Sequence, residues 1–161
     1  MDEVYRQVAQ ELSGSSLTRH GQLRLKVTSN SMSPILKLGD HVLVHSVSPD
    51  VLIRGDILVT QRPGGYLTHR FIFMDGHGWV TKGDRNRKAD APIPLEALVG
   101  LVVSRERNGH SRNLHTRFQR YLARISGWLG WKEVTSKSSP IPWMAKYISR
   151  FISVLPWIWE L

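Results

Sequence analysis

The amino-acid sequence predicts a mainly β fold: a compact β domain with a short helix before it and amphipathic helices after it. Between residues 18 and 108 the apolar residues gather in short runs, each of strand rather than helix length. Clusters of Gly, Pro and Asp separate these runs, as they do at turns between strands. Outside this range the apolar residues recur at helical spacing. We therefore divide the chain into an N-terminal helix with its linker (1–17), the β domain (18–108) and a helical tail (109–161).

The N-terminal helix is predicted over residues 3–13. Val4, Val8 and Leu12 lie four positions apart, which places them on one helical face. Gly14 follows as the end of the helix. A stretch rich in Ser, Gly and Thr then leads into the β domain.

Six strands are predicted in the β domain. In the first, Leu23, Leu25 and Val27 alternate with polar residues, which is the pattern of a strand with one buried face. The other five are short apolar runs bounded by turn residues such as Leu38-Gly39-Asp40. The predicted strands cover residues 23–28, 41–45, 56–60, 66–73, 78–81 and 97–104.

Beyond the β domain the period of the apolar residues becomes helical. From Asn113 onward they return every three or four positions, opposite a row of arginines. These apolar residues are Leu114, Phe118, Leu122, Ile125 and Leu129. A second amphipathic segment is predicted over residues 143–155. Five of the six tryptophans fall in this tail, interleaved with Lys and Arg.

The positive charge of the chain is concentrated in the tail. The formal net charge is +9, and residues 101–161 hold ten Lys or Arg against three Glu. Such an excess indicates an anionic partner, either lipid headgroups or nucleic acid. One interpretation is that residues 111–161 contact an anionic membrane surface, with aromatic rings in the headgroup layer. The alternative is a helical cap packed on the β domain or on a partner subunit. No nucleic-acid-binding motif is recognisable, so no nucleic acid is expected, and the oligomeric state stays open.

The composition also restricts the chemistry and the location. Cysteine is absent, which excludes disulfides, thiolate metal sites and cysteine nucleophiles. The chain opens with the acidic Met1-Asp2-Glu3, where a signal peptide has basic residues. No run approaches the roughly 20 apolar residues of a membrane span. We therefore expect no signal peptide and no transmembrane span, and a protein that is cytoplasmic or peripheral at a membrane surface.

A serine-rich turn, Ser29–Pro34 (Ser-Asn-Ser-Met-Ser-Pro), directly follows the first predicted strand. Serine-type hydrolysis needs a nucleophile in a rigid, exposed turn, a base within reach, a group that orients the base and donors for the oxyanion. Pro34 stiffens the exit of this turn, and the backbone N–H of Ser31 is a candidate oxyanion donor. Together with Leu38-Gly39-Asp40 and the Val-Leu-Val strand after it, the turn resembles the nucleophile box of type I signal peptidases. The LexA-like self-cleaving repressors share a form of this box.

Two further segments resemble boxes of the same family in the same order. Arg54–Val59 is similar to the second box, and Leu67–Arg70 occupies the position of the general base. That base is a lysine in the common bacterial branch. The archaeal and endoplasmic-reticulum branch has a histidine followed by an arginine, as His69 and Arg70 are here.

The acidic box of the histidine branch has a counterpart as well. Thr81–Asn86 resembles it, with Asp90 six residues after Asp84. Gly100–Val103 looks like the closing strand. The resemblance covers about residues 20–105 and implies the compact β fold of the signal-peptidase and LexA-like superfamily.

Carried over residue by residue, the resemblance implies a role for each site residue. Ser31 would be the nucleophile and His69 the general base. Asp90 would orient His69, and Asp84 would be a second acidic residue of the catalytic site; which carboxylate orients the histidine stays open. The hydroxyl of Ser29 and the N–H of Ser31 would form the oxyanion hole. Neither a cofactor nor a metal is expected.

The function implied by the resemblance is that of a serine endopeptidase. Such an enzyme would cleave a signal or leader segment from a precursor polypeptide, after a small residue. One alternative is a LexA-like self-cleaving regulator, which would need a helix-turn-helix before residue 30, where the chain offers little room. The other is a non-enzymatic membrane- or partner-binding module on a peptidase scaffold.

Overall fold

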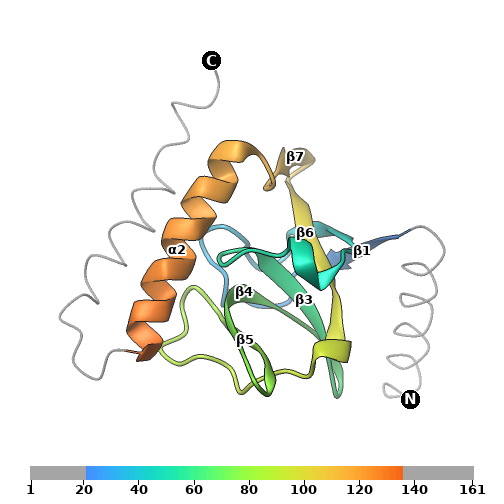
Figure 1. The fold of residues 1–161 in the computed structure, drawn as a ribbon. Coiled ribbons are helices and arrows are strands. Elements are labelled where there is room, and N and C mark those ends of the chain that lie inside the picture. The colour runs from blue at the N-terminus through green and yellow to red at the C-terminus, as the bar shows by residue number, and fades with distance from the viewer. Residues whose placement is uncertain (1–20, 136–161) are drawn as a thin grey trace.

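The computed structural model describes residues 21–135 (Figure 1). They form one antiparallel sheet of seven strands and one α-helix, which confirms the predicted mainly β fold. The elements in chain order are β1 (Gln22–Lys26), β2 (His41–His45), the 3-10 turn η1 (Pro49–Val51), β3 (Ile57–Arg62), β4 (Gly65–Asp75), β5 (Gly78–Lys82), η2 (Leu95–Ala97), β6 (Leu98–Arg107), β7 (His110–Asn113) and α2 (Arg117–Thr135). The helices predicted over residues 3–13 and 143–155 lie outside the described residues.

The strands follow the order β1-β2-β6-β3-β4-β5, and every neighbouring pair is antiparallel. Strand β6 is the centre of this arrangement, because it pairs with β2 along one edge and with both β3 and β7 along the other. Register shifts interrupt three of the pairings, at Leu43/Val44, Val59/Thr60 and Phe71/Phe73. Such irregularities bend strands, and they give a sheet this long its curvature.

Both faces of the sheet are buried, because consecutive residues of its central strands belong to different core clusters. In β3, Val59 packs in one cluster with Met32 and Leu36, whereas its neighbour Leu58 packs in a second with Trp79. Side chains alternate between faces along a strand, so the two clusters lie on opposite faces of the sheet. The first cluster includes the anchors of the serine-rich turn, and this is how the core fixes the position of that turn.

Helix α2 lies along one side of the sheet and packs against it at close range (Figure 1). A Cβ atom built on Gly55 would overlap the carbonyl group of Ala123, and one built on Gly127 would lie 2.7 Å from the backbone nitrogen of Gly55. The backbones therefore touch without side chains between them. Arg54 adds a cation–π contact, with its guanidinium 5.1 Å from the centre of the Trp131 ring.

The structure corrects the sequence prediction after residue 104. The helix predicted from Asn113 begins at Arg117, and residues 110–113 form β7, which pairs with β6. Asn108 and Gly109 both have positive φ, 51° and 79°, which is the geometry of a tight hairpin turn. Because β7 belongs to the sheet, the domain boundary placed after residue 108 falls inside it.

Within residues 21–135 no helix is both long enough and apolar enough to cross a bilayer.

Candidate active site

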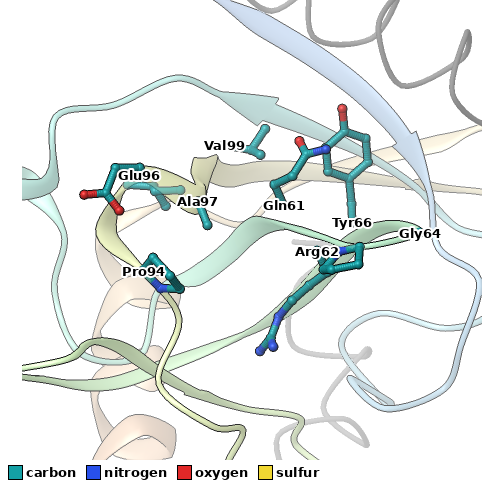
Figure 2. Close-up of a pocket in the computed structure, with 10 residues that line it drawn as sticks. Gln61, Arg62, Gly64, Tyr66, Pro94, Glu96, Ala97 and Val99 are labelled. Carbon is teal, nitrogen blue, oxygen red and sulfur yellow. The ribbon is translucent and has the colours of Figure 1, made fainter.

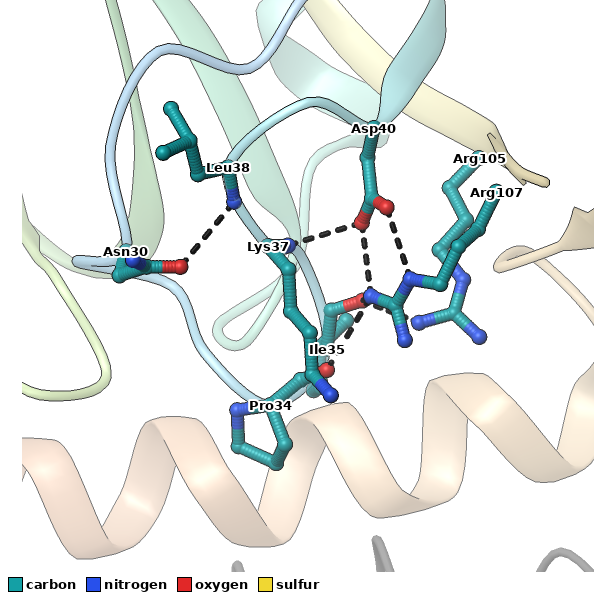
Figure 3. A network of polar contacts seen from close by, with 8 residues as sticks. All are labelled: Asn30, Pro34, Ile35, Lys37, Leu38, Asp40, Arg105 and Arg107. Carbon is teal, nitrogen blue, oxygen red and sulfur yellow. Dashed lines mark hydrogen bonds and ion pairs between the residues drawn. The ribbon is translucent and has the colours of Figure 1, made fainter.

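The serine-rich turn lies in the connection between β1 and β2, and buried side chains and hydrogen bonds within that connection hold it in place. Met32 is 2% exposed and Leu36 is fully buried, and the N–H of Leu36 donates to the carbonyl of Met32. Across the connection, the side-chain oxygen of Asn30 accepts a hydrogen bond from the N–H of Leu38 at 3.1 Å (Figure 3). Ser31 lies between these anchors and is partly exposed. The turn therefore presents a serine hydroxyl on a well-supported backbone.

A partly buried ion pair supports the same connection. Asp40 receives two hydrogen bonds from Arg107, each 2.7 Å long, and a third from the N–H of Lys37 at 2.8 Å (Figure 3). Arg105 donates to the carbonyl of Ile35 at 2.5 Å. Burial by itself raises the pKa of Asp40, but the hydrogen bonds from Arg107 and Lys37 outweigh it and lower the pKa below 3.8.

This lowered pKa predicts how stability depends on pH. A carboxylate whose pKa is lower in the folded than in the unfolded state contributes stability at neutral pH, and the contribution is lost as pH falls through the folded pKa. Asp40→Asn should therefore destabilise the protein at pH 7, and the difference from wild type should shrink below pH 3.8. Urea unfolding across this range measures it, with the exposed Asp50→Asn as the control. A difference that stays constant with pH would contradict the assignment.

Strand β4 brings His69 to the hydroxyl of Ser31. His69 is 5% exposed, and it faces Leu58 across the β3–β4 pairing. Its Nε2 lies 3.0 Å from Oγ of Ser31, and its Nδ1 lies 2.7 Å from Oδ2 of Asp90. Three residues separated by up to 59 positions in the sequence thus form one continuous chain of hydrogen bonds.

Asp90 is fixed from the other side by Thr81 of β5. The Thr81 hydroxyl donates to Oδ2 of Asp90 at 2.6 Å, and the N–H of Asp90 donates to the Thr81 carbonyl at 2.8 Å. Burial raises the pKa of Asp90, but the hydrogen bonds from His69 and Thr81, together with the charge of Arg62, produce a net lowering. An ionised carboxylate only accepts hydrogen bonds, so Nδ1 of His69 carries the proton and Nε2 is free to accept one from Ser31.

The structure separates the roles of the two predicted carboxylates. Asp84 accepts hydrogen bonds from Nε and Nη2 of Arg70, each 2.7 Å long, in a bidentate ion pair. Arg70 is 2% exposed and also donates to the carbonyl of Gly55 at 2.6 Å. Burial lowers the pKa of Arg70, but the charge of Asp84 outweighs it and raises the pKa, which keeps the guanidinium charged. Asp84 is therefore paired with Arg70, and Asp90 is the carboxylate that is hydrogen-bonded to the histidine.

Ser29 lies beside the Ser31 hydroxyl. The two Oγ atoms are 3.1 Å apart, and the N–H of Ser31 donates to Oγ of Ser29 at a longer distance of 3.4 Å. Both groups named as oxyanion donors thus adjoin the atom that would attack a substrate.

Two further contacts that support the site are not predicted from the sequence. The N–H of Arg85 donates to the carbonyl of Ser31 at 2.8 Å and so ties the acidic segment to the nucleophile turn. Gly83 lies against the imidazole, since a Cβ atom there would stand 3.0 Å from Nε2 of His69. The sequence Lys82-Gly83-Asp84 indicates a turn. It does not indicate that His69 lies where a side chain at residue 83 would be, because that contact forms only in the folded protein.

An open pocket of about 700 Å³ lies at the tip of the β3–β4 hairpin, apart from this chain of hydrogen bonds. Gln61, Tyr66 and Val99 line it, and the side chain of Arg62 points away from the first two (Figure 2). None of Ser31, His69 or Asp90 lines it. Within residues 21–135 no three His, Cys, Asp or Glu residues are grouped so that they could hold a metal ion.

The hydrogen-bonded chain has the order that nucleophilic hydrolysis requires: a serine hydroxyl, an imidazole and a carboxylate. No protein-family model matches the chain and no curated protein matches it, so the assignment of this site depends on its own geometry.

Proposed function

We propose that the chain is a serine endopeptidase of the signal-peptidase type, which removes a signal or leader segment from a precursor polypeptide. The observation that carries the proposal is the pair of short contacts at His69, 3.0 Å to the Ser31 hydroxyl and 2.7 Å to the Asp90 carboxylate. A structural histidine needs one such partner. A histidine held between a partly exposed serine and a partly buried carboxylate is arranged as a general base.

In the proposed reaction, Oγ of Ser31 attacks the scissile carbonyl carbon while Nε2 of His69 takes its proton. The Asp90 carboxylate stabilises the imidazolium that forms. The negative charge on the carbonyl oxygen is met by the hydroxyl of Ser29 and the N–H of Ser31, and each such donor lowers the barrier by about 3 kcal/mol. His69 then returns the proton to the leaving amine, and water hydrolyses the acyl-enzyme by the same steps.

The sheet offers a place for an extended substrate beside the nucleophile. Residues 65–69 of β4 pair with β3 on one edge, whereas the pairing with β5 on the other edge begins only at Arg70. Within residues 21–135, that second edge of 65–69 thus has no strand partner, and it leads directly to His69. A peptide could add to it as a further strand, which supplies main-chain hydrogen bonds regardless of sequence. The proposed places of action are the cytoplasm or a membrane surface.

The proposal is tested by sequencing the new termini that the protein creates in a complex peptide mixture. Mass spectrometry should find a set of cleavage sites after small residues for the wild type. Ser31→Ala, purified in the same way, should produce none of them. Ser33→Ala is the matched control, because it removes a hydroxyl from the same turn, and it should retain the wild-type set. Identical termini from Ser31→Ala and wild type, or none from the wild type, would overturn the proposal.

A further inference from the structure

The outward face of α2 carries four residues that the fold of the β domain does not use. We call Tyr121, Arg124, Trp128 and Lys132 the outer stripe; neighbours in it are three or four positions apart and so share one helical face. Tyr121 is 62% exposed and Trp128 is 45% exposed, which is unusual for such large aromatic side chains. Arg124 is exposed as well.

The opposite face of the helix is the one that packs on the sheet. Ala123 and Gly127 touch the backbone at Gly55, and Gly130 lies against the Ile72 side chain. At 100° per residue these three positions are on the far side of the helix from the outer stripe. The stripe therefore lies away from the positions that contact the sheet most closely, and its composition needs another explanation.

That composition alternates aromatic and cationic side chains. The ammonium group of Lys132 lies 4.1 Å from the centre of the Trp128 ring, so the two form a cation–π pair on the surface. Helix α2 as a whole has four Lys or Arg and one Glu. Tyr and Trp rings favour the headgroup layer of a membrane, where one end of the ring is apolar and the other hydrated. Arg and Lys meet the charge of anionic lipids in the same layer.

We propose that the outer stripe of α2 is a docking surface for an anionic lipid membrane, with the helix lying parallel to the surface. The convex face of a single helix suits a flat partner, whereas single-stranded nucleic acid is usually held in a groove that follows its backbone. Docking of this exposed, cationic surface on a membrane does not require the proposed peptidase activity. If both hold, the peptidase site works beside the membrane, because α2 touches Gly55, whose carbonyl binds Arg70 next to His69.

The first test measures binding of the full chain to vesicles. Wild type should sediment with vesicles of phosphatidylcholine and phosphatidylglycerol and stay in solution with phosphatidylcholine alone. Arg124→Glu/Lys132→Glu should weaken partitioning at least about tenfold. Arg87→Glu/Lys88→Glu makes the same change in net charge at two exposed positions outside α2 and should retain most of the binding. Circular dichroism checks that both variants keep the fold.

The second test isolates α2 from the basic residues 136–161. Because the chain has no cysteine, Tyr121→Cys can carry a single environment-sensitive fluorophore. Its emission should shift to the blue with anionic vesicles only, and a label at Glu96→Cys on η2 should not respond. A label at residue 121 that stays in water while the protein sediments would overturn the proposal. So would an equal loss in both charge-reversal variants, or binding of single-stranded RNA without binding of vesicles.

Discussion

Asp90→Ala is expected to lower kcat about 10⁴-fold, with a much smaller change in KM. The substitution removes the acceptor that holds the proton on Nδ1 of His69 and the negative charge that stabilises the imidazolium. The serine and the proposed oxyanion donors remain, so substrate binding should be largely preserved. Steady-state kinetics on a peptide identified from the new termini measure both constants.

The matched control for this variant is Asp75→Ala, which removes a carboxylate from the β4–β5 turn, where it binds only the N–H of His77. It should retain wild-type kcat. A value of kcat for Asp90→Ala within tenfold of wild type would contradict the catalytic assignment. Unfolding experiments on the same samples exclude a general loss of structure.

Asp84→Ala is expected to lower the free energy of unfolding by about 3–5 kcal/mol, the cost of leaving a buried charge unpaired. Arg70 is 2% exposed, and after the substitution only the carbonyl of Gly55 would remain as its hydrogen-bond acceptor among the described contacts. Because α2 packs on Gly55, cooperative unfolding should shift for the sheet and the helix together. Urea denaturation followed by circular dichroism measures the loss.

The double variant Arg70→Met/Asp84→Ala separates an unpaired charge from a lost contact. It removes both partners of the ion pair, so neither is left buried without the other, and it should therefore be more stable than Asp84→Ala alone. If the double variant is the less stable of the two, the ion pair is not the source of the effect.

Much of the β domain could be predicted because its signals are local. Strand β2 has the predicted bounds, β5 ends one residue beyond its predicted end, and β3, β4 and β6 end two or three residues beyond theirs. Strand β7 was missed, although Asn108-Gly109 is a strong hairpin signal, because the apolar residues after it follow a helical period. A short polar strand such as His110–Asn113 is stabilised by its pairing with β6, and periodicity does not detect pairing.

The site residues could be proposed from the sequence, but their connections could not. Asp84 and Asp90 both follow β5 in a loop, and composition gives no reason to prefer one. Two contacts determine which carboxylate reaches His69. Arg70, the next residue on the strand, faces away from His69 and binds Asp84, whereas Thr81 holds Asp90 toward the imidazole. These contacts span up to 14 positions of sequence, and only the folded arrangement determines them.

The contact between Gly55 and α2 limits which amino-acid substitutions the sheet and the helix can accept. No side chain fits at residue 55 against the Ala123 carbonyl, and none fits at residue 127 against the Gly55 nitrogen. At these two positions backbone packs directly on backbone, and no flexible side chain lies between them to absorb a change. A helix from another protein could not be grafted here unless it also carried small residues at these spacings. A larger residue on either surface would need a compensating shift in the other, and the sheet and its helix therefore constrain each other's sequence.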